Sequence, residues 1–330
     1  MSRLYAMGVV LACAGCPSPL DGGERLMDTG WFTDTGSGPV SSCTARVVDT
    51  LPVADAVDWY WRDAPHVWVE ETSSVYEVRL IDEVGRITQT TLDWSDDALS
   101  FHARFDGGLA PLTRYTLEIT DCGTVHEIPF ETGALGRPVD GGVTSLVGKT
   151  YQIGLGEAEW VEPGGFGPLL SLYFDDPILL GVEWVDDTRI DFVGAQGYID
   201  SFGEIGQASG PLWDFPMSEF ADRPYFENRA ELVTLEVLGA ALPITDFVLD
   251  GTFDASGTFF GGGVLSGNGD TRDMGALAGS PGEEAAICDL AATLGVMCDP
   301  CSDGQPYCLY VELHDVVGSL VDGLTLVRDD

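Results

Sequence analysis

Basic residues are scarce in this sequence, and lysine is almost missing. Fourteen arginines and a single lysine, Lys149, stand against 54 acidic residues, which gives a formal net charge of −39. A surface with this charge repels nucleic acid and anionic lipid headgroups, so we exclude both as partners. Long apolar runs are missing as well, since no stretch approaches the ~20 apolar residues that a membrane-spanning helix needs.

Motifs that carry known chemistry are missing too, because the sequence has no GxSxG, Walker A or HExxH motif. Gly261-Gly262-Gly263 follows a strand without a helix after it, which is typical of a turn or bulge. The histidines do not lie at metal-ligand spacings; they are His66, His102, His126 and His314. We therefore expect that the protein is not an enzyme and that it binds no cofactor. Ca²⁺ held by an acidic pair such as Asp96-Asp97 is the remaining cofactor hypothesis, and an enzyme of unrecognised type is the third functional hypothesis.

The first sixteen residues resemble a bacterial lipoprotein signal. Arg3 precedes a short apolar stretch that ends in Ala14-Gly15-Cys16. Signal peptidase needs small side chains beside the scissile bond, and the following cysteine supplies the thiol for lipid attachment. Cleavage before Cys13 is the alternative, but it would leave Cys16 as an odd thiol, whereas cleavage before Cys16 leaves six further cysteines. We expect lipidation at Cys16, with the lipid as a membrane anchor in the cell envelope.

Residues 17–42 are predicted to be a flexible tether, because they are poor in apolar residues and rich in Gly, Asp, Thr, Ser and Pro. Asp28-Thr29-Gly30 and Asp34-Thr35-Gly36 repeat the active-site triplet of aspartic proteases, but they lie six residues apart. Those enzymes hold the two carboxylates in a rigid buried pair, which a tether does not provide. By resemblance to lipoproteins generally, Pro17 directly after the anchor favours the outer membrane.

Short strands with period-two alternation are predicted from Cys43 to Gly133. The alternating apolar residues are Trp59, Trp61, Val67, Val69, Tyr76, Val78, Leu80, Phe101, Ala103, Phe105, Tyr115, Leu117 and Ile119. Turn residues separate these runs and no helical pattern interrupts them, so residues 43–134 are expected to form a sandwich of antiparallel sheets.

The segment Leu109–Ile119 resembles the late strands of bacterial Ig-like domains of the surface-layer type, in which a leucine, a proline and a tyrosine precede an alternating strand. Phe130-Glu131-Thr132-Gly133 is similar to the phenylalanine-x-threonine-glycine ending of that family. The resemblance covers about ninety residues. It implies an Ig-like sandwich that serves as a spacer or binding module without catalytic residues, and it makes Tyr115 the expected tyrosine corner.

Residues 135–143 are a predicted linker, and residues 144–330 are predicted to form a second β-rich domain. Its expected strands are 151–155, 169–174, 178–185, 189–193, 232–238, 247–253 and 257–265. One short helix is expected to begin at the capping box Ser280-Pro281-Gly282-Glu283 and to end at Gly295. The predicted fold class is therefore all-β, an Ig-like antiparallel sandwich followed by a second β-sandwich or barrel-like domain.

We expect the six cysteines beyond the anchor to form disulfides, as in other exported proteins. Cys43 and Cys122, near the two ends of the Ig-like domain, are predicted to pair. The other four lie in the Cys-rich segment 280–308 and are Cys288, Cys298, Cys301 and Cys308, with three pairings possible. Two alternatives are a zinc site formed by these four cysteines and a redox pair, Cys298 and Cys301, in a thioredoxin-like CxPC motif. Structural disulfides are favoured because the expected helix precedes this motif, whereas it follows the motif in thioredoxins.

The loop 209–226 combines aromatic residues with three prolines, a pattern too broken for a strand. Its aromatic residues include Trp213, Phe215, Phe220 and Tyr225. The function predicted first is a lipid-anchored, non-enzymatic surface module: a spacer, an adhesin-like protein or a binder of a protein or glycan partner. The alternative is a binding protein for a sugar or a small apolar molecule, with its pocket in residues 144–330 and this loop as the lid.

Overall fold

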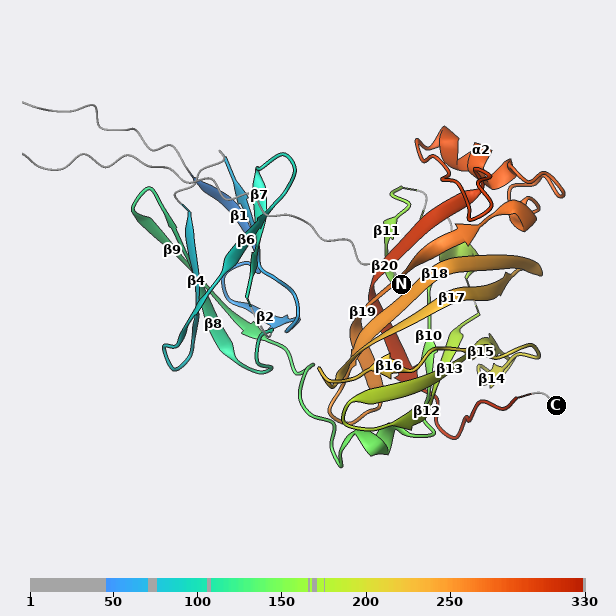
Figure 1. Ribbon diagram of the computed structural model, residues 1–330, viewed down its shortest axis with the longest axis horizontal. Coiled ribbons are helices and arrows are strands. Elements are labelled where there is room, and N and C mark those ends of the chain that lie inside the picture. Colours follow the sequence, from blue (N-terminus) through green and yellow to red (C-terminus); the bar gives the residue numbers. More distant parts are fainter. Residues whose placement is uncertain are drawn as a thin grey trace, which may run out of the picture. The chain divides into compact units, whose positions relative to one another are not determined.

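The computed structural model describes residues 46–70, 76–105, 108–165, 167, 171–174 and 176–328 (Figure 1). Cys16, the tether 17–42 and Cys43 lie outside these residues. β-Strands make up most of the regular structure, which confirms the all-β fold class. Among the described residues, no helix has the length and apolar character that crossing a membrane requires.

Residues 46–133 form a sandwich of two sheets, which we call the N-terminal sandwich. One sheet has the order β1-β3-β7-β6 and the other β2-β9-β8-β4-β5. The strands are β1 (Val47–Leu51), β2 (Ala56–Trp59), β3 (His66–Val69), β4 (Glu77–Asp82), β5 (Ile87–Gln89), β6 (Thr91–Trp94), β7 (Ser100–Arg104), β8 (Arg114–Asp121) and β9 (Thr124–Thr132). All neighbours are antiparallel except β2 and β9, which run parallel. The two sheets therefore form the layers of a β-sandwich, as the sequence predicts.

Alternating side chains of these strands fill the core between the two sheets, as the period-two pattern predicts. Val67, Phe101, Leu117 and Ile119 are completely buried. The hydroxyl oxygen of Tyr115, at the start of β8, accepts a hydrogen bond of 2.9 Å from the amide of Ala110. The predicted tyrosine corner is therefore present, and it ties the chain before β8 to the edge of the sheet.

Residues 143–328 form a second, strongly curved structure, which we call the curved sheet. Its main order is β14-β13-β12-β10-β20-β19-β18-β17; β11 pairs with β20, and β15 and β16 pair with β13. The strands are β10 (Thr150–Ile153), β11 (Glu159–Glu162), β12 (Ile178–Val185), β13 (Arg189–Ile199), β14 (Ile205–Gln207), β15 (Trp213–Asp214), β16 (Ser218–Glu219), β17 (Tyr225–Val237), β18 (Ala240–Phe253), β19 (Phe259–Asp270) and β20 (Cys308–Leu320). Figure 1 shows the long strands β17 to β20 bending together along their length.

An aromatic cluster fills one region of the core enclosed by the curved sheet. Phe253, completely buried at the end of β18, has its ring centroid 5.0 Å from that of Phe226, 5.4 Å from Tyr151 and 5.9 Å from Phe260. Space here is so limited that a Cβ atom at Gly318 would lie 2.0 Å from the Phe260 ring. The small residue lets β19 and β20 pair while the large ring occupies the core.

Three expectations for this part need correction. Residues 171–173, expected in a strand, form the 3₁₀-helix η2 (Ser171–Tyr173). The predicted linker belongs partly to the core, because Val139 and Val143 are buried and the 3₁₀-helix η1 (Val143–Leu146) begins there. The loop 209–226 contains the short strands β15 and β16. β15 and β16 pair with β13, and Val139 lies near Gly257, so contacts distant in sequence override the local pattern at these two places. The Gly261–Gly263 bulge is confirmed by register shifts in β19 at this point.

The predicted helix is present, but it begins later than the capping box predicts. Helix α2 (Ala286–Thr293) follows Ala285, whose side chain makes no capping hydrogen bond. Gly282 has a φ of +85°, so the chain turns away from helical geometry inside the expected first turn. A short 3₁₀-helix, η3 (Arg272–Met274), precedes this turn. At the other end the prediction is correct, since Gly295 has a φ of +85° and the amide of Val296 donates to the carbonyl of Ala291.

The C-terminal cysteines form two disulfides between near neighbours in the sequence. Cys288 pairs with Cys298, and Cys301 pairs with Cys308. The first bond ties α2 to the segment after it, and the second ties the following turn to the start of β20. Cys122 is also disulfide-bonded, and Cys43, its predicted partner, lies outside the described residues.

Candidate binding site at the junction

The segment after β2 brings three large side chains, Tyr60, Trp61 and Arg62, to the junction between the N-terminal sandwich and the curved sheet. Trp61 is only 9% exposed and belongs to the core of the sandwich. Its indole ring lies against Gly136, where a Cβ atom would come within 2.9 Å of the ring and where φ is +96°. A glycine at this position therefore lets the chain turn directly over the indole.

Thr252, a completely buried residue of β18, receives the polar ends of two of these side chains. The Tyr60 and Thr252 hydroxyl oxygens lie 2.6 Å apart, and the Trp61 indole nitrogen donates to the Thr252 hydroxyl over 3.3 Å. The Tyr60 ring lies over Gly262, whose φ is +61° in the β19 bulge. Burial raises the pKa of Tyr60 to about 12, so its hydroxyl keeps its proton near neutral pH.

Arg62 makes the third contact of this junction. Its guanidinium carbon lies 3.6 Å from the ring centroid of Tyr225, at the start of β17, and 5.3 Å from that of Trp61. The Tyr225 hydroxyl donates to Asp250 over 3.2 Å, and the amide of Val264 donates to the same carboxylate. Burial raises the pKa of both Tyr225 and Asp250. These contacts place the guanidinium group over the face of the Tyr225 ring.

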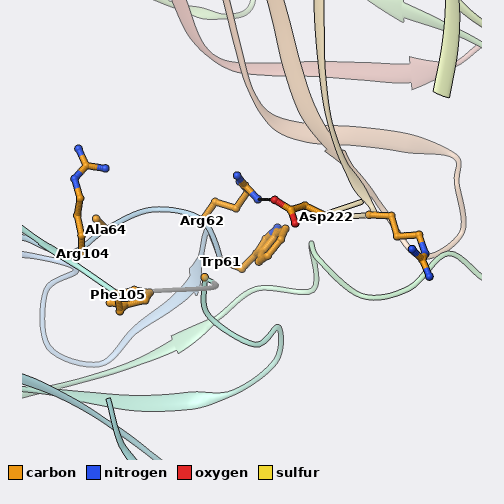
Figure 2. A pocket seen from close by; sticks show the side chains of 8 residues that line it. Trp61, Arg62, Ala64, Arg104, Phe105 and Asp222 are labelled. Carbon is orange, nitrogen blue, oxygen red and sulfur yellow. Dashed lines mark ion pairs between the residues drawn. The ribbon is translucent and has the colours of Figure 1, made fainter. Parts of the chain in front are cut away.

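A cleft of about 470 Å³ opens beside this junction (Figure 2). Its lining includes Trp61, Arg62, Arg104, Phe105, Asp222 and Arg223. We call it the arginine cleft, because three of these residues are arginines. An arginine side chain presents planar, permanently charged hydrogen-bond donors, which bind carboxylate and phosphate groups. Each of the three is paired with an aspartate: Arg62 with Asp222 at 3.7 Å, Arg104 with Asp93 at 2.9 Å and Arg223 with Asp187 at 3.4 Å.

The four aromatic residues of the loop 209–226 do not gather at one place. Phe215 and Phe220 are buried in the core, where the Phe215 ring packs 5.9 Å from Phe247. Trp213 packs against the same core as a partly buried residue of β15. Tyr225 lies in the junction under Arg62. Two of the four side chains thus help to fill the core of the curved sheet.

An apolar cavity of about 30 Å³ lies within the curved sheet, lined by residues that include Leu235, Leu265 and Ile287. Pockets for small ligands are usually about 300–1,000 Å³, so this cavity is far below that range. No group of three or more histidine, cysteine or acidic side chains within the described ranges is placed to hold a metal ion.

The alternation of apolar residues predicts Trp61 only as a strand residue, and no motif assigns a role to Arg62. The run Trp59-Tyr60-Trp61-Arg62 was a signal, since three aromatic residues and an arginine in sequence are typical of contact surfaces. Its partners Tyr225 and Thr252 are more than 160 residues away, and nothing in the local pattern connects them.

Comparisons with protein-family models and with curated proteins find no match to this sequence. The arguments about function below therefore rest on the residues and their geometry.

Asp63, at the exposed rim of the junction, is expected to make stability depend on pH. Partial burial and the negative charge of Asp315 raise its pKa from 3.8 to about 6, while His314 opposes the shift. Between these values the folded chain holds a proton that the unfolded chain releases, so stability falls as pH rises from about 4 to 6. We expect Asp63→Asn to make this decrease in the free energy of unfolding smaller by about 1 kcal/mol, a value that allows for screening by solvent.

The measurement is urea unfolding of both proteins at about pH 4.5 and pH 6.5. Other carboxylates also titrate in this range, so the result is the difference between the wild type and the variant. Asp140→Asn, at another exposed aspartate, is the control and should follow the wild type. An Asp63→Asn protein with the wild-type pH dependence would contradict the prediction.

Proposed function

We propose that this chain is a lipid-anchored protein of the cell envelope that acts as a non-enzymatic surface module. In this proposal the lipid on Cys16 holds the protein to the outer membrane, and the tether 17–42 separates the folded part from the lipid. Residues 46–328 then form a fixed unit that acts as a spacer or presents a surface to a partner. The β-sandwich and the disulfides in the described part suit an exported protein.

The observation that carries this proposal is the junction between the N-terminal sandwich and the curved sheet. Connections between domains usually allow relative motion unless the interface is large and apolar. Here Tyr60 and Trp61 reach a completely buried threonine, and Arg62 stacks on Tyr225. Such contacts favour one relative orientation. A spacer or a display module needs this property, since a surface can be held at a set distance only by a stiff support.

The alternative, a pocket for a sugar or apolar ligand within residues 144–330, gains less support. Phe215 and Phe220, two residues of its proposed lid, are buried in the core. The apolar cavity is only about 30 Å³, and two larger clefts in these residues, of about 270 and 370 Å³, are not lined by any of the four loop aromatics. A titration of tryptophan fluorescence with sugars and lipids tests this alternative, and a saturable shift would support it.

Replacing the anchor residue tests the membrane attachment. A single acyl chain binds a membrane only marginally, whereas two or more acyl chains on one cysteine hold a protein there stably. We expect Cys16→Ser to lower the membrane-bound fraction by more than about tenfold, measured by detergent phase separation of cells that express the full chain. Mass spectrometry of the wild-type protein should show an acylated Cys16.

Cys13→Ser is the matched control, because it changes a cysteine within the same signal. Cleavage before Cys16 removes this residue, so the variant should stay in the membrane. If Cys13→Ser is released and Cys16→Ser is retained, cleavage occurs before Cys13 and the proposed anchor residue is wrong. If both variants partition as the wild type does, the lipid-anchor proposal fails.

A further inference from the structure

A second cleft, of about 420 Å³, opens at the junction beside Trp59 and Tyr60, and we call it the Trp59 cleft. It lies where the N-terminal sandwich, the residues 133–137 that follow it and the curved sheet meet. Ligand pockets occur preferentially at such domain interfaces, and their usual volume is about 300–1,000 Å³. The Trp59 cleft is therefore large enough for a small organic molecule, unlike the apolar cavity within the curved sheet.

The lining of this cleft carries three negative charges and one positive charge. The charged residues are Asp58, Asp254, Asp315 and Arg137. Partial burial opposes the charge on Asp254, but hydrogen bonds within its own turn outweigh burial and lower its pKa. Within the described residues neither Asp58 nor Asp315 forms an ion pair, whereas their neighbours Asp55 and His314 do. Arg137 is not paired with any of the three aspartates either, so their charges are left without a partner.

The electrostatic effect of these charges is seen at Asp63, beside the cleft. Its backbone carbonyl accepts a hydrogen bond of 3.2 Å from the Trp59 indole nitrogen. Partial burial and the negative charge of Asp315 raise its pKa to about 6, while His314 opposes the shift. The field that disfavours a further negative charge at this place favours a positive one. The net charge of −39 also attracts cations to the protein at long range.

Aromatic rings supply the second part of the site. Trp59 is half-buried and meets Phe130 edge to face, with 6.4 Å between the ring centroids. Phe259, at the start of β19, also lines the cleft and is 38% exposed. The face of an aromatic ring attracts cations, and alkylated ammonium groups are commonly bound by such rings. The same junction already contains one contact of this kind, between Arg62 and Tyr225.

We propose that the Trp59 cleft binds a small organic cation whose charge is carried by an alkylated ammonium group. Such a group combines a positive charge with an apolar surface, and the cleft offers carboxylates to the charge and aromatic rings to both. A metal ion matches less well, because no group of three or more histidine, cysteine or acidic side chains in the described ranges is placed to hold one. The site goes beyond the proposed function, since neither a spacer nor a lipid anchor requires it.

The test is a calorimetric titration of the purified full-length protein with choline and with 3,3-dimethyl-1-butanol, an uncharged molecule of nearly the same shape. We expect saturable binding of choline, and binding of the alcohol that is weaker by about tenfold or more, because only choline carries the charge.

Two variants should change choline binding in opposite directions. Asp315→Asn should weaken it by about threefold, and Arg137→Gln should strengthen it by about threefold, because the first removes a negative charge and the second a positive one. Asparagine readily adopts the left-handed conformation that Asp315 has, with a φ of +53°, so the first substitution changes the charge and leaves the backbone in place.

Asp246→Asn is the matched control, because Asp246 is also an exposed aspartate with a φ of +53° but does not line the cleft. It should bind choline as the wild type does. Four results would overturn the proposal: no saturable binding up to about 10 mM choline, equal binding of the uncharged alcohol, unchanged binding by Asp315→Asn, or weaker binding by Arg137→Gln. The last result would mean that the arginine itself holds the ligand. None of these results would affect the test of the lipid anchor.

Discussion

Trp61→Ala is expected to destabilise the N-terminal sandwich by about 3–5 kcal/mol, the usual cost of removing a large buried aromatic side chain. The indole is 9% exposed, lies against Gly136 and donates to Thr252. Its loss leaves a cavity in the core and removes one of the two hydrogen bonds that join the sandwich to the buried threonine. The same substitution should therefore loosen the junction.

Two measurements separate these effects. Urea unfolding followed by circular dichroism gives the loss of stability, and small-angle X-ray scattering under native conditions gives the radius of gyration. We expect a lower unfolding midpoint and a larger radius of gyration, because the two parts gain freedom to move. Trp184→Ala is the control, since Trp184 in β12 is 42% exposed. Equal results for the two variants would contradict the role of Trp61.

Phe253→Ala is expected to have a similar effect on the curved sheet, about 3–5 kcal/mol. Phe253 is completely buried and its ring meets those of Tyr151, Phe226 and Phe260. Because these rings come from several strands, the cavity left by the alanine is bounded by a fixed β-framework that cannot easily collapse. A cost near the upper end of the range is therefore expected.

The matched control is Phe202→Ala, at a phenylalanine that is 89% exposed. Surface substitutions usually change stability by no more than about 0.5 kcal/mol, so this variant should unfold as the wild type does. Thermal unfolding of the three proteins gives the comparison. A Phe253→Ala protein within about 1 kcal/mol of the wild type would mean that the aromatic cluster repacks around the gap.

The parts of the fold that follow from the sequence are those set by local pattern. Apolar residues at every second position, such as Tyr115, Leu117 and Ile119, indicate a strand with one buried face. All three side chains are buried in the structure. The tyrosine corner is similarly local, since Tyr115 and Ala110 are five residues apart. Gly295 ends α2 because a glycine in the left-handed conformation completes the helix end.

The junction did not follow from the sequence, because it depends on contacts between distant segments. Nothing in the sequence around Thr252 marks it as a contact residue; its role comes from the hydrogen bonds with Tyr60 and Trp61, which lie far away in the sequence. The arginine cleft is similar, since Arg104 ends β7 and Arg223 precedes β17. The predicted start of α2 was wrong for another reason. Ser280 and Glu283 fit a capping box, but the chain turns at Gly282 before the helix begins.

The order of strands in the curved sheet also has a consequence for how the protein folds. β20 pairs with β10 on one side and with β19 on the other, so the hairpins of β10–β13 and those of β17–β19 are joined through the strand that comes last in sequence. The hairpins can form early from neighbouring residues, but closing the sheet requires loops of more than one hundred residues. Such late, non-local pairing slows folding. The curved sheet is therefore expected to close only after β20 is available for pairing.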